Sequence, residues 1–251
     1  MCRHLAYLGP PTTLASVVLD PPHSLERQAF APKEQRHSPV NADGFGVGWW
    51  VPAVRAEPAV YRNDTPIWAD RSFPSIAGVI SASAMVAAVR SATPPNPVEV
   101  SGVAPFAHEQ WLFSLNGWID GVWEGRGTEL RRSLPPGLDA RIRSASDGDL
   151  MFSLVLAALP TGADLADAVG RVVASLAVEN PKGPLNVLLS DGHSIIATAA
   201  GNSLHIRSSP GSVIVASEPL DERSGWMPVP DHSLVVATVD GATITALSSP
   251  P

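Results

Sequence analysis

Two predicted helices in the middle of the chain stand between two groups of short apolar segments, and this order limits the fold more than any other feature. The first helix is expected to follow Ser146 and to run to about residue 159. The second is expected over about 164–178, where one face carries Leu165, Val169, Val172, Val173 and Leu176. Strands on both sides of a central helical pair predict an α+β protein: a four-layer αββα sandwich of two packed, mainly antiparallel sheets covered by helices.

The segments outside the helices have the pattern of short strands separated by turns. Before the helices, strands are predicted over 3–8, 44–51, 59–62, 85–90 and 111–115, with short helices over 13–19 and 24–30. After Pro181, strands are predicted over 185–189, 195–199, 204–207, 213–216, 234–239 and 243–247. Turns between them are marked by Asp191-Gly192, Gly201-Asn202 and Asp240-Gly241. No linker-like stretch interrupts the series, so residues 1–251 are predicted to form a single domain.

Composition argues against several kinds of function. The 251 residues carry a net charge of −7 without a run of Lys or Arg, which argues against nucleic-acid binding. No uninterrupted apolar stretch reaches the ~20 residues that span a bilayer, and the first residues lack the pattern of a secretion signal. We therefore expect a cytoplasmic protein without a membrane partner, and a homo-oligomer stays open. The seven His residues are dispersed, and no phosphate-binding loop or Gly-x-Gly-x-x-Gly motif occurs, so neither a metal nor a cofactor is expected.

The single cysteine, Cys2, directly follows the initiator methionine. Methionine is normally trimmed when the second residue is small, so removal of Met1 would leave a thiol and a free α-amine on one residue. The α-amine titrates near ~7.7–8.0 and can therefore accept the proton of the thiol and later return it. Cys2 is thus a candidate N-terminal nucleophile. The alternative is a small residue that only begins a strand.

The dipeptide Asn116-Gly117 follows the predicted strand over 111–115 and has two interpretations. An Asn-Gly pair after a strand is typical of a hairpin turn. The Asn side-chain amide and the Gly backbone N–H could instead converge on one oxygen and stabilise the oxyanion of acyl transfer.

Arg90 and Asp147 are candidates for recognising a free amino-acid head. Arg90 ends a predicted strand and could form a bidentate pair with a carboxylate, or it could be a surface arginine. Asp147 follows Ser146 in the first turn of a predicted helix, where it could accept hydrogen bonds from an ammonium group or only offset the helix dipole. Ser146 and Asp149 have the spacing of a capping box.

These motifs together resemble the class II glutamine amidotransferases, which are N-terminal-nucleophile hydrolases with an αββα fold. The resemblance covers nearly the full chain, and its motifs occur in the family's order: Met1-Cys2, Asn41-Ala42-Asp43-Gly44-Phe45-Gly46-Val47-Gly48-Trp49, Arg90-Ser91-Ala92-Thr93, Asn116-Gly117, Ser146-Asp147-Gly148-Asp149, and Ser217-Glu218-Pro219-Leu220 followed by Trp226. The chain differs from the synthase-type members, which often have Trp and His where Ser91 and Pro94 stand, and His where Leu115 stands.

The resemblance implies a role for each matching residue. Cys2 would attack a γ-amide carbonyl with its own α-amine as base and then acid, and Asn116 and Gly117 would hold the oxyanion. Arg90 and Asp147 would bind the carboxylate and ammonium ends of a γ-glutamyl group, and Thr93 belongs to the same substrate-binding motif. Trp118, which follows the oxyanion pair, is a candidate to contact a cationic leaving group through its aromatic face, with ordinary packing as the alternative.

Three functions are compatible with this family assignment. The chain could hydrolyse a small-molecule γ-glutamyl amide whose released amine is the product. It could instead be a glutaminase subunit that supplies ammonia to a separate synthetase. The third possibility is a non-catalytic domain that has kept the fold.

Overall fold

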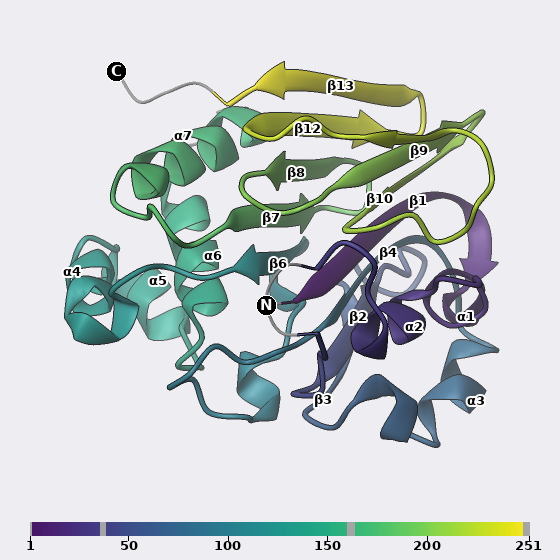
Figure 1. Ribbon diagram of the computed structural model, residues 1–251, viewed down its shortest axis with the longest axis horizontal. Helices are drawn as coiled ribbons and strands as arrows, with labels where there is room; N and C mark the ends of the chain where they lie inside the picture. The colour runs from purple at the N-terminus through teal and green to yellow at the C-terminus, as the bar shows by residue number, and fades with distance from the viewer. Residues whose placement is uncertain (1, 36–38, 160–163, 248–251) are drawn as a thin grey trace.

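The computed structural model describes residues 2–35, 39–159 and 164–247, so the expected loss of Met1 concerns a residue outside the described ranges. Two sheets pack face to face, and helices cover the outer face of each (Figure 1). All strand pairs of the described residues are antiparallel. The predicted α+β class and the αββα layering are confirmed.

The first sheet has seven strands in the order β11-β9-β10-β1-β4-β2-β3. Its strands are β1 (Arg3–Thr13), β2 (Phe45–Trp49), β3 (Ala59–Asn63), β4 (Ser81–Val89), β9 (His205–Ser209), β10 (Ser212–Ala216) and β11 (Trp226–Pro228). Three short helices lie on its outer face: α1 (Leu14–Val18), α2 (Leu25–Phe30) and α3 (Phe73–Ala77). β1, which begins next to Cys2, lies between β10 and β4 near the middle of this sheet.

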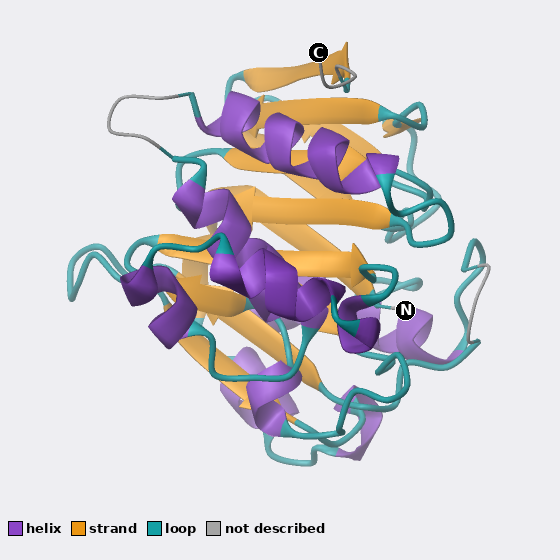
Figure 2. Cartoon of the chain, turned by 90° about the vertical axis from the view of Figure 1, so that its left-hand side faces the viewer, coloured by secondary structure: helices purple, strands orange, loops and turns teal. Residues whose placement is uncertain are grey.

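The second sheet has six strands in the order β13-β12-β8-β7-β6-β5. Its strands are β5 (Phe106–His108), β6 (Trp111–Gly117), β7 (Leu185–Ser190), β8 (Ile195–Ala199), β12 (Ser233–Thr238) and β13 (Gly241–Ala246). The predicted central helices are α6 (Asp147–Ala157) and α7 (Leu165–Val178), and they lie across this sheet (Figure 2). Two further helices precede them, α4 (Arg126–Arg132) and α5 (Pro136–Arg141).

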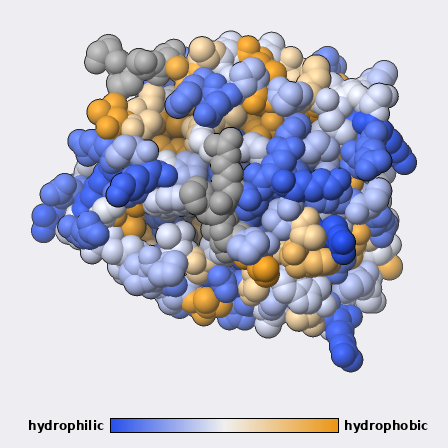
Figure 3. Space-filling model, viewed as in Figure 1, coloured by the Kyte–Doolittle hydropathy of each residue, from blue (hydrophilic) through white to orange (hydrophobic). Residues whose placement is uncertain are grey.

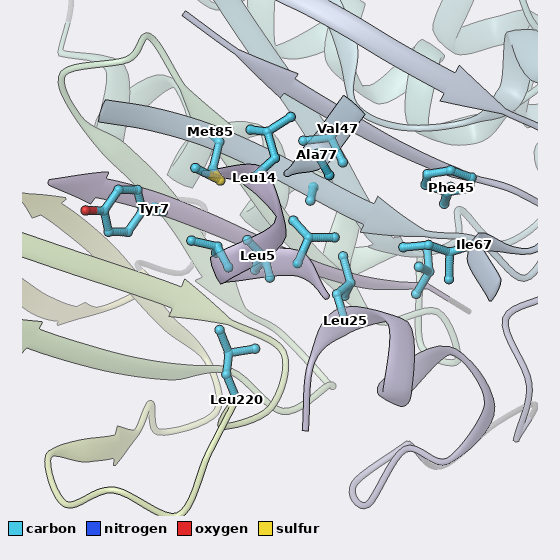
Figure 4. Packing of buried hydrophobic residues seen from close by; sticks show 14 of the residues in the cluster. Leu5, Tyr7, Leu14, Leu25, Phe45, Val47, Ile67, Ala77, Met85 and Leu220 are labelled. Atoms are coloured by element: carbon cyan, nitrogen blue, oxygen red, sulfur yellow. The ribbon is translucent and has the colours of Figure 1, made fainter. Parts of the chain in front are cut away.

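Three apolar clusters hold the four layers together. Side chains alternate along β1, so this strand contributes to two of the clusters. Leu5 and Tyr7 point toward the helices, while Ala6 and Leu8 point between the sheets. Figure 4 shows the outer cluster, in which side chains from the sheet and from the helices above it meet. The third cluster joins α6 and α7 to the second sheet, and its Phe113 and Phe152 rings stack with centroids 5.0 Å apart. α6 is therefore fixed on β6.

Local signals misplaced several element boundaries. β1 continues to Thr13 instead of ending at residue 8, because a register shift between Leu8 and Thr12 places Pro10 and Pro11 where no ladder hydrogen bond is required. Thr13 itself caps α1. β4 begins at Ser81, four residues before its predicted start. The strands β5 and β11 and the helices α3, α4 and α5 were not predicted.

Only the Ser146 half of the predicted capping box is present. The Ser146 hydroxyl accepts a hydrogen bond from the Gly148 N–H, as a cap does. The Asp149 carboxylate instead accepts from the backbone N–H groups of Arg143 and Ser144 and pairs with Arg141. An aspartate is one methylene shorter than the glutamate of a capping box, and here the preceding loop supplies its donors.

Polar residues cover most of the face shown in Figure 3, where apolar residues form separate patches. Within the described ranges, no helix is both long enough and apolar enough to cross a membrane.

Candidate active site

The start of β1 meets the end of β6 where the two sheets face each other. The backbone nitrogen of Cys2 donates a hydrogen bond of 3.2 Å to Asn116 Oδ1. In the chain as described this nitrogen is the amide that joins Cys2 to Met1, and it stands in for the α-amine that removal of Met1 would expose. The predicted nucleophile and the predicted oxyanion residue, 114 positions apart in sequence, are thus neighbours.

A cavity of about 430 Å³, its open mouth included, lies at this junction. Five of the seven predicted site residues line it: Cys2, Arg90, Thr93, Gly117 and Asp147. They come from the start of β1, the segment after β4, the end of β6 and the start of α6.

Asn116 and Gly117 are part of β6, so the hairpin interpretation of this dipeptide is wrong. They pair with Asn186 and Leu185 of β7. Trp118 N–H donates to the Pro184 carbonyl, and strand alternation therefore turns the Gly117 N–H away from β7. A Cβ on Gly117 would lie 1.7 Å from the Pro184 carbonyl oxygen, so only glycine fits this close approach.

The Asn116 amide has one engaged end and one available end. Its Oδ1 accepts from the Cys2 nitrogen and from Asn202 Nδ2. Its Nδ2 is buried and has no hydrogen-bond partner among the described residues. A buried donor without a partner costs free energy, which is expected where a substrate oxygen completes the bonding. Asn116 Nδ2 and the Gly117 N–H are therefore suited to hold an oxyanion.

Arg90 presents a similar available donor. The residue is 6% exposed, and its Nη2 donates to the Pro97 carbonyl at 3.0 Å. Nη1 is buried without a hydrogen-bond partner in the described part of the chain. A Cβ on Gly102 would lie 2.8 Å from Nη2, so this glycine leaves room for the guanidinium. The arrangement agrees with a carboxylate-binding role and not with a surface arginine.

Asp147 is buried at the start of α6 and lines the same cavity. One carboxylate oxygen accepts from Ile119 N–H at 3.0 Å and the other from Gly148 N–H at 3.1 Å. Burial raises the pKa of Asp147 above its ordinary value, although these donors and the charge of Arg90 oppose the shift. A buried carboxylate destabilised in this way is suited to receive a cation. Its position also fits the helix-dipole alternative.

Asn116 does not itself line the cavity but is bonded to Cys2, which does. Trp118 does not line the cavity either. Its indole Nε1 donates to Asp120 at 2.8 Å, and its carbonyl accepts from Asn180. These bonds hold the indole within the turn that follows β6. The cavity instead includes residues that sequence reasoning did not single out for binding, among them Asn96, Phe106 and Ser146.

Glu218, in the Ser217-Glu218 motif, pairs with Arg3 at the start of β1. Glu218 is fully buried, lies 3.1 Å from the Nε of the fully buried Arg3, and accepts from His23 Nε2 at 2.7 Å. It also accepts from the backbone N–H groups of Lys33 and Glu34. Burial alone would raise the pKa of Glu218, but these donors and Arg3 bring it below its ordinary value. The cluster ties the residue after Cys2 to the segment that follows α2.

Across the described residues, no group of three or more His, Cys, Asp or Glu side chains is arranged to hold a metal ion.

Comparison with known proteins decides the family. No family model matches the chain. The gamma-glutamyl-hercynylcysteine sulfoxide hydrolase of Mycobacterium tuberculosis is 40% identical over 247 residues, which cover 98% of this chain and 97% of that protein. The protein of the same name from Mycolicibacterium smegmatis is 40% identical over 94% of this chain and 95% of its own. The chain belongs to the gamma-glutamyl-hercynylcysteine sulfoxide hydrolase family.

A solved structure supports the fold of this hydrolase family member. A glutamine aminotransferase class-II domain protein from Silicibacter pomeroyi superposes with a TM-score of 0.73 at 22% identity, over 98% of this chain and all of that one. The family resemblance expected from the motifs is confirmed.

The Glu218 cluster gives a stability prediction. Glu218→Gln leaves Arg3 buried without its counter-charge, so the free energy of unfolding at pH 7 should fall by about 3–5 kcal/mol, measured by urea denaturation. Because the native pKa of Glu218 is depressed, the wild-type stabilisation is complete above the ordinary value of 4.5 and is lost as the pH falls through the native pKa. The two proteins should therefore converge in acid.

A matched control for this variant is Glu222→Gln, the same chemical change at an exposed side chain. It should change the stability by no more than about 0.5 kcal/mol. Equal losses in the two variants would show that the buried pair contributes nothing.

Proposed function

We propose that this protein hydrolyses the γ-glutamyl amide bond of γ-glutamyl hercynylcysteine sulfoxide to glutamate and hercynylcysteine sulfoxide, a step of ergothioneine biosynthesis. The observation that carries the proposal is the 40% identity, over 98% of the chain, to hydrolases named for this substrate. The cavity supports it, because Cys2, Gly117, Arg90 and the buried Asp147 line one pocket, and Asn116 is bonded to the Cys2 nitrogen at its edge. The proposal includes a single amidotransferase-like domain over residues 1–251, a cytoplasmic location and, as an open point, a homo-oligomer.

The reaction begins on Cys2 after removal of Met1. The α-amine takes the thiol proton, and the sulfur attacks the γ-carbonyl carbon. The carbonyl oxygen becomes an oxyanion that accepts from Asn116 Nδ2 and the Gly117 N–H. The amine then returns its proton to the leaving nitrogen as the carbon–nitrogen bond breaks, leaving a thioester. Water, activated by the same amine, attacks the thioester carbon and releases glutamate.

The far end of the cavity selects the γ-glutamyl head. Arg90 binds the α-carboxylate, since its Nη1 lacks a partner among the described residues. Asp147 binds the α-ammonium, whose positive charge offsets the burial of the carboxylate. Thr93, in the loop after Arg90, contacts the head from the cavity wall. Trp118 lies outside this pocket, so a contact with the leaving amine and ordinary packing both stay open for it.

The alternatives are a glutaminase subunit for a separate synthetase and a hydrolase of another γ-glutamyl amide. The family favours hydrolysis of γ-glutamyl hercynylcysteine sulfoxide over both alternatives, because the relatives that are 40% identical are named for this substrate.

Turnover of γ-glutamyl hercynylcysteine sulfoxide and of free glutamine by the purified protein tests the proposal. We expect a higher kcat/KM for the sulfoxide, and loss of both activities in Cys2→Ala. Faster turnover of glutamine would favour the glutaminase alternative, and unchanged activity of Cys2→Ala would exclude nucleophilic catalysis by this residue.

The raised pKa of Asp147 gives a pH prediction. In the inactive Cys2→Ala variant, L-glutamine should bind less tightly as the pH falls, and the weakening should begin above pH 3.8, the ordinary pKa of aspartate. The reason is that protonation of Asp147 removes the charged partner of the ligand ammonium. Calorimetric titration across the acid range measures this effect.

The double variant Cys2→Ala with Asp147→Asn provides the control. It should bind L-glutamine weakly and without this pH dependence. A pH dependence that survives in the double variant would assign it to another group.

A further inference from the structure

We propose that Asn202 is a positioning residue that sets the orientation of the Asn116 amide and thereby aims the oxyanion donor. The inference rests on the proposed function and adds to it a residue from the second half of the chain. Asn202 lies in the bend between β8 and β9 and is 9% exposed. Its Nδ2 is 3.0 Å from the Asn116 carbonyl oxygen and 3.2 Å from Asn116 Oδ1.

These two contacts fix which way both amides face. A backbone carbonyl only accepts hydrogen bonds, so the Asn202 group beside the Asn116 carbonyl must be its NH₂. That same NH₂ requires an acceptor at the Asn116 side chain, which places Oδ1 toward Asn202 and Nδ2 on the other side. Asn116 Nδ2 is the buried group that has no partner among the described residues.

The Cys2 nitrogen cannot set this orientation alone. In the proposed reaction the α-amine changes between a neutral base and a charged acid, and its hydrogen bonds change with it. The Asn202 amide does not titrate, so it remains a donor to Asn116 Oδ1 in every step. Asn202 therefore keeps the oxyanion donor in place while the neighbouring Cys2 α-amine gains and loses its proton.

Asn202 is itself held by the sheet. The fully buried Asn186 of β7 accepts from the Asn202 N–H at 3.0 Å and donates its Nδ2 to the Asn202 carbonyl, also at 3.0 Å. Asn186 also accepts from the Ala200 N–H. Gly201 supports the bend with a φ of +95°, a left-handed conformation that glycine adopts without strain. Asn186 is also the residue of β7 that pairs with Asn116.

Two substitutions at Asn202 test the role. Asn202→Asp keeps the shape but replaces the donor by an acceptor, which favours the reversed Asn116 amide. Asn202→Ala removes the donor altogether. We expect kcat for the γ-glutamyl substrate to fall on the order of 10²–10³-fold in each, the loss typical of one oxyanion donor. KM should change little, because Arg90 and Asp147 still bind the head.

A double-variant cycle separates positioning from a general structural role. If Asn202 acts through Asn116, then Asn116→Ala combined with Asn202→Ala should be no slower than Asn116→Ala alone. Ser203→Ala is the matched control, since it removes a side-chain hydrogen bond to Ser217 from the same bend without touching Asn116. Its kcat should stay within about threefold of the wild type.

The outcomes distinguish this inference from the proposed function. An inactive wild type would overturn the proposed function and with it the inference. An active wild type with unchanged kcat in Asn202→Asp, or with additive losses in the double variant, would overturn the inference alone. Thermal unfolding of each variant shows whether it is folded. If Asn202→Ala is unfolded, the isosteric Asn202→Asp and its combination with Asn116→Ala carry the test.

Discussion

The hydrogen bond between the Cys2 nitrogen and Asn116 Oδ1 connects the two sheets at the point where the chemistry is proposed to occur. Cys2 precedes β1, which is flanked by β10 and β4, and Asn116 belongs to β6, which is flanked by β7 and β5. Each partner is thus carried by a strand that is bonded on both sides. Atoms placed in this way move little relative to each other, and such rigidity is what acyl transfer requires of a nucleophile and its oxyanion donors.

The molecule carries several buried polar groups whose bonding is incomplete without substrate. Arg90 Nη1 and Asn116 Nδ2 lack partners among the described residues, and Asp147 has a pKa raised by burial. Each lowers the stability of the free protein. A ligand with a carboxylate, an ammonium and a carbonyl oxygen in the right order would satisfy all three. The proposed selectivity for a γ-glutamyl head would therefore follow from groups that are destabilising on their own.

The sequence was informative where one local signal decided the structure. The apolar face of α7, the capping serine of α6 and most strands of the second sheet were predicted because their patterns depend on neighbouring residues only. The first strand was predicted to end at residue 8, because local sequence patterns do not reveal the register shift that accommodates Pro10 and Pro11. Asn116-Gly117 is the clearest case: its local preference is a hairpin turn, and pairing with β7 overrides it.

The site residues were predictable to the extent that motifs carried them. The motifs indicated Cys2, Arg90, Gly117 and Asp147, which line one cavity. Asn202 was visible in the sequence only as part of a turn, because its bond to Asn116 spans 86 positions and leaves no local trace. The bonding of Trp118 was also hidden, since Asp120 and Asn180 determine where its indole and carbonyl point.

The central claim is that the working molecule begins at Cys2, with its own α-amine beside Asn116. The intact mass of the active protein from its native host, before and after a brief exposure to substrate and an acid quench, tests this most directly. The account predicts a chain shorter by one methionine residue, and a transient species heavier by one glutamyl group. Full activity in a protein that still carries Met1 would contradict it.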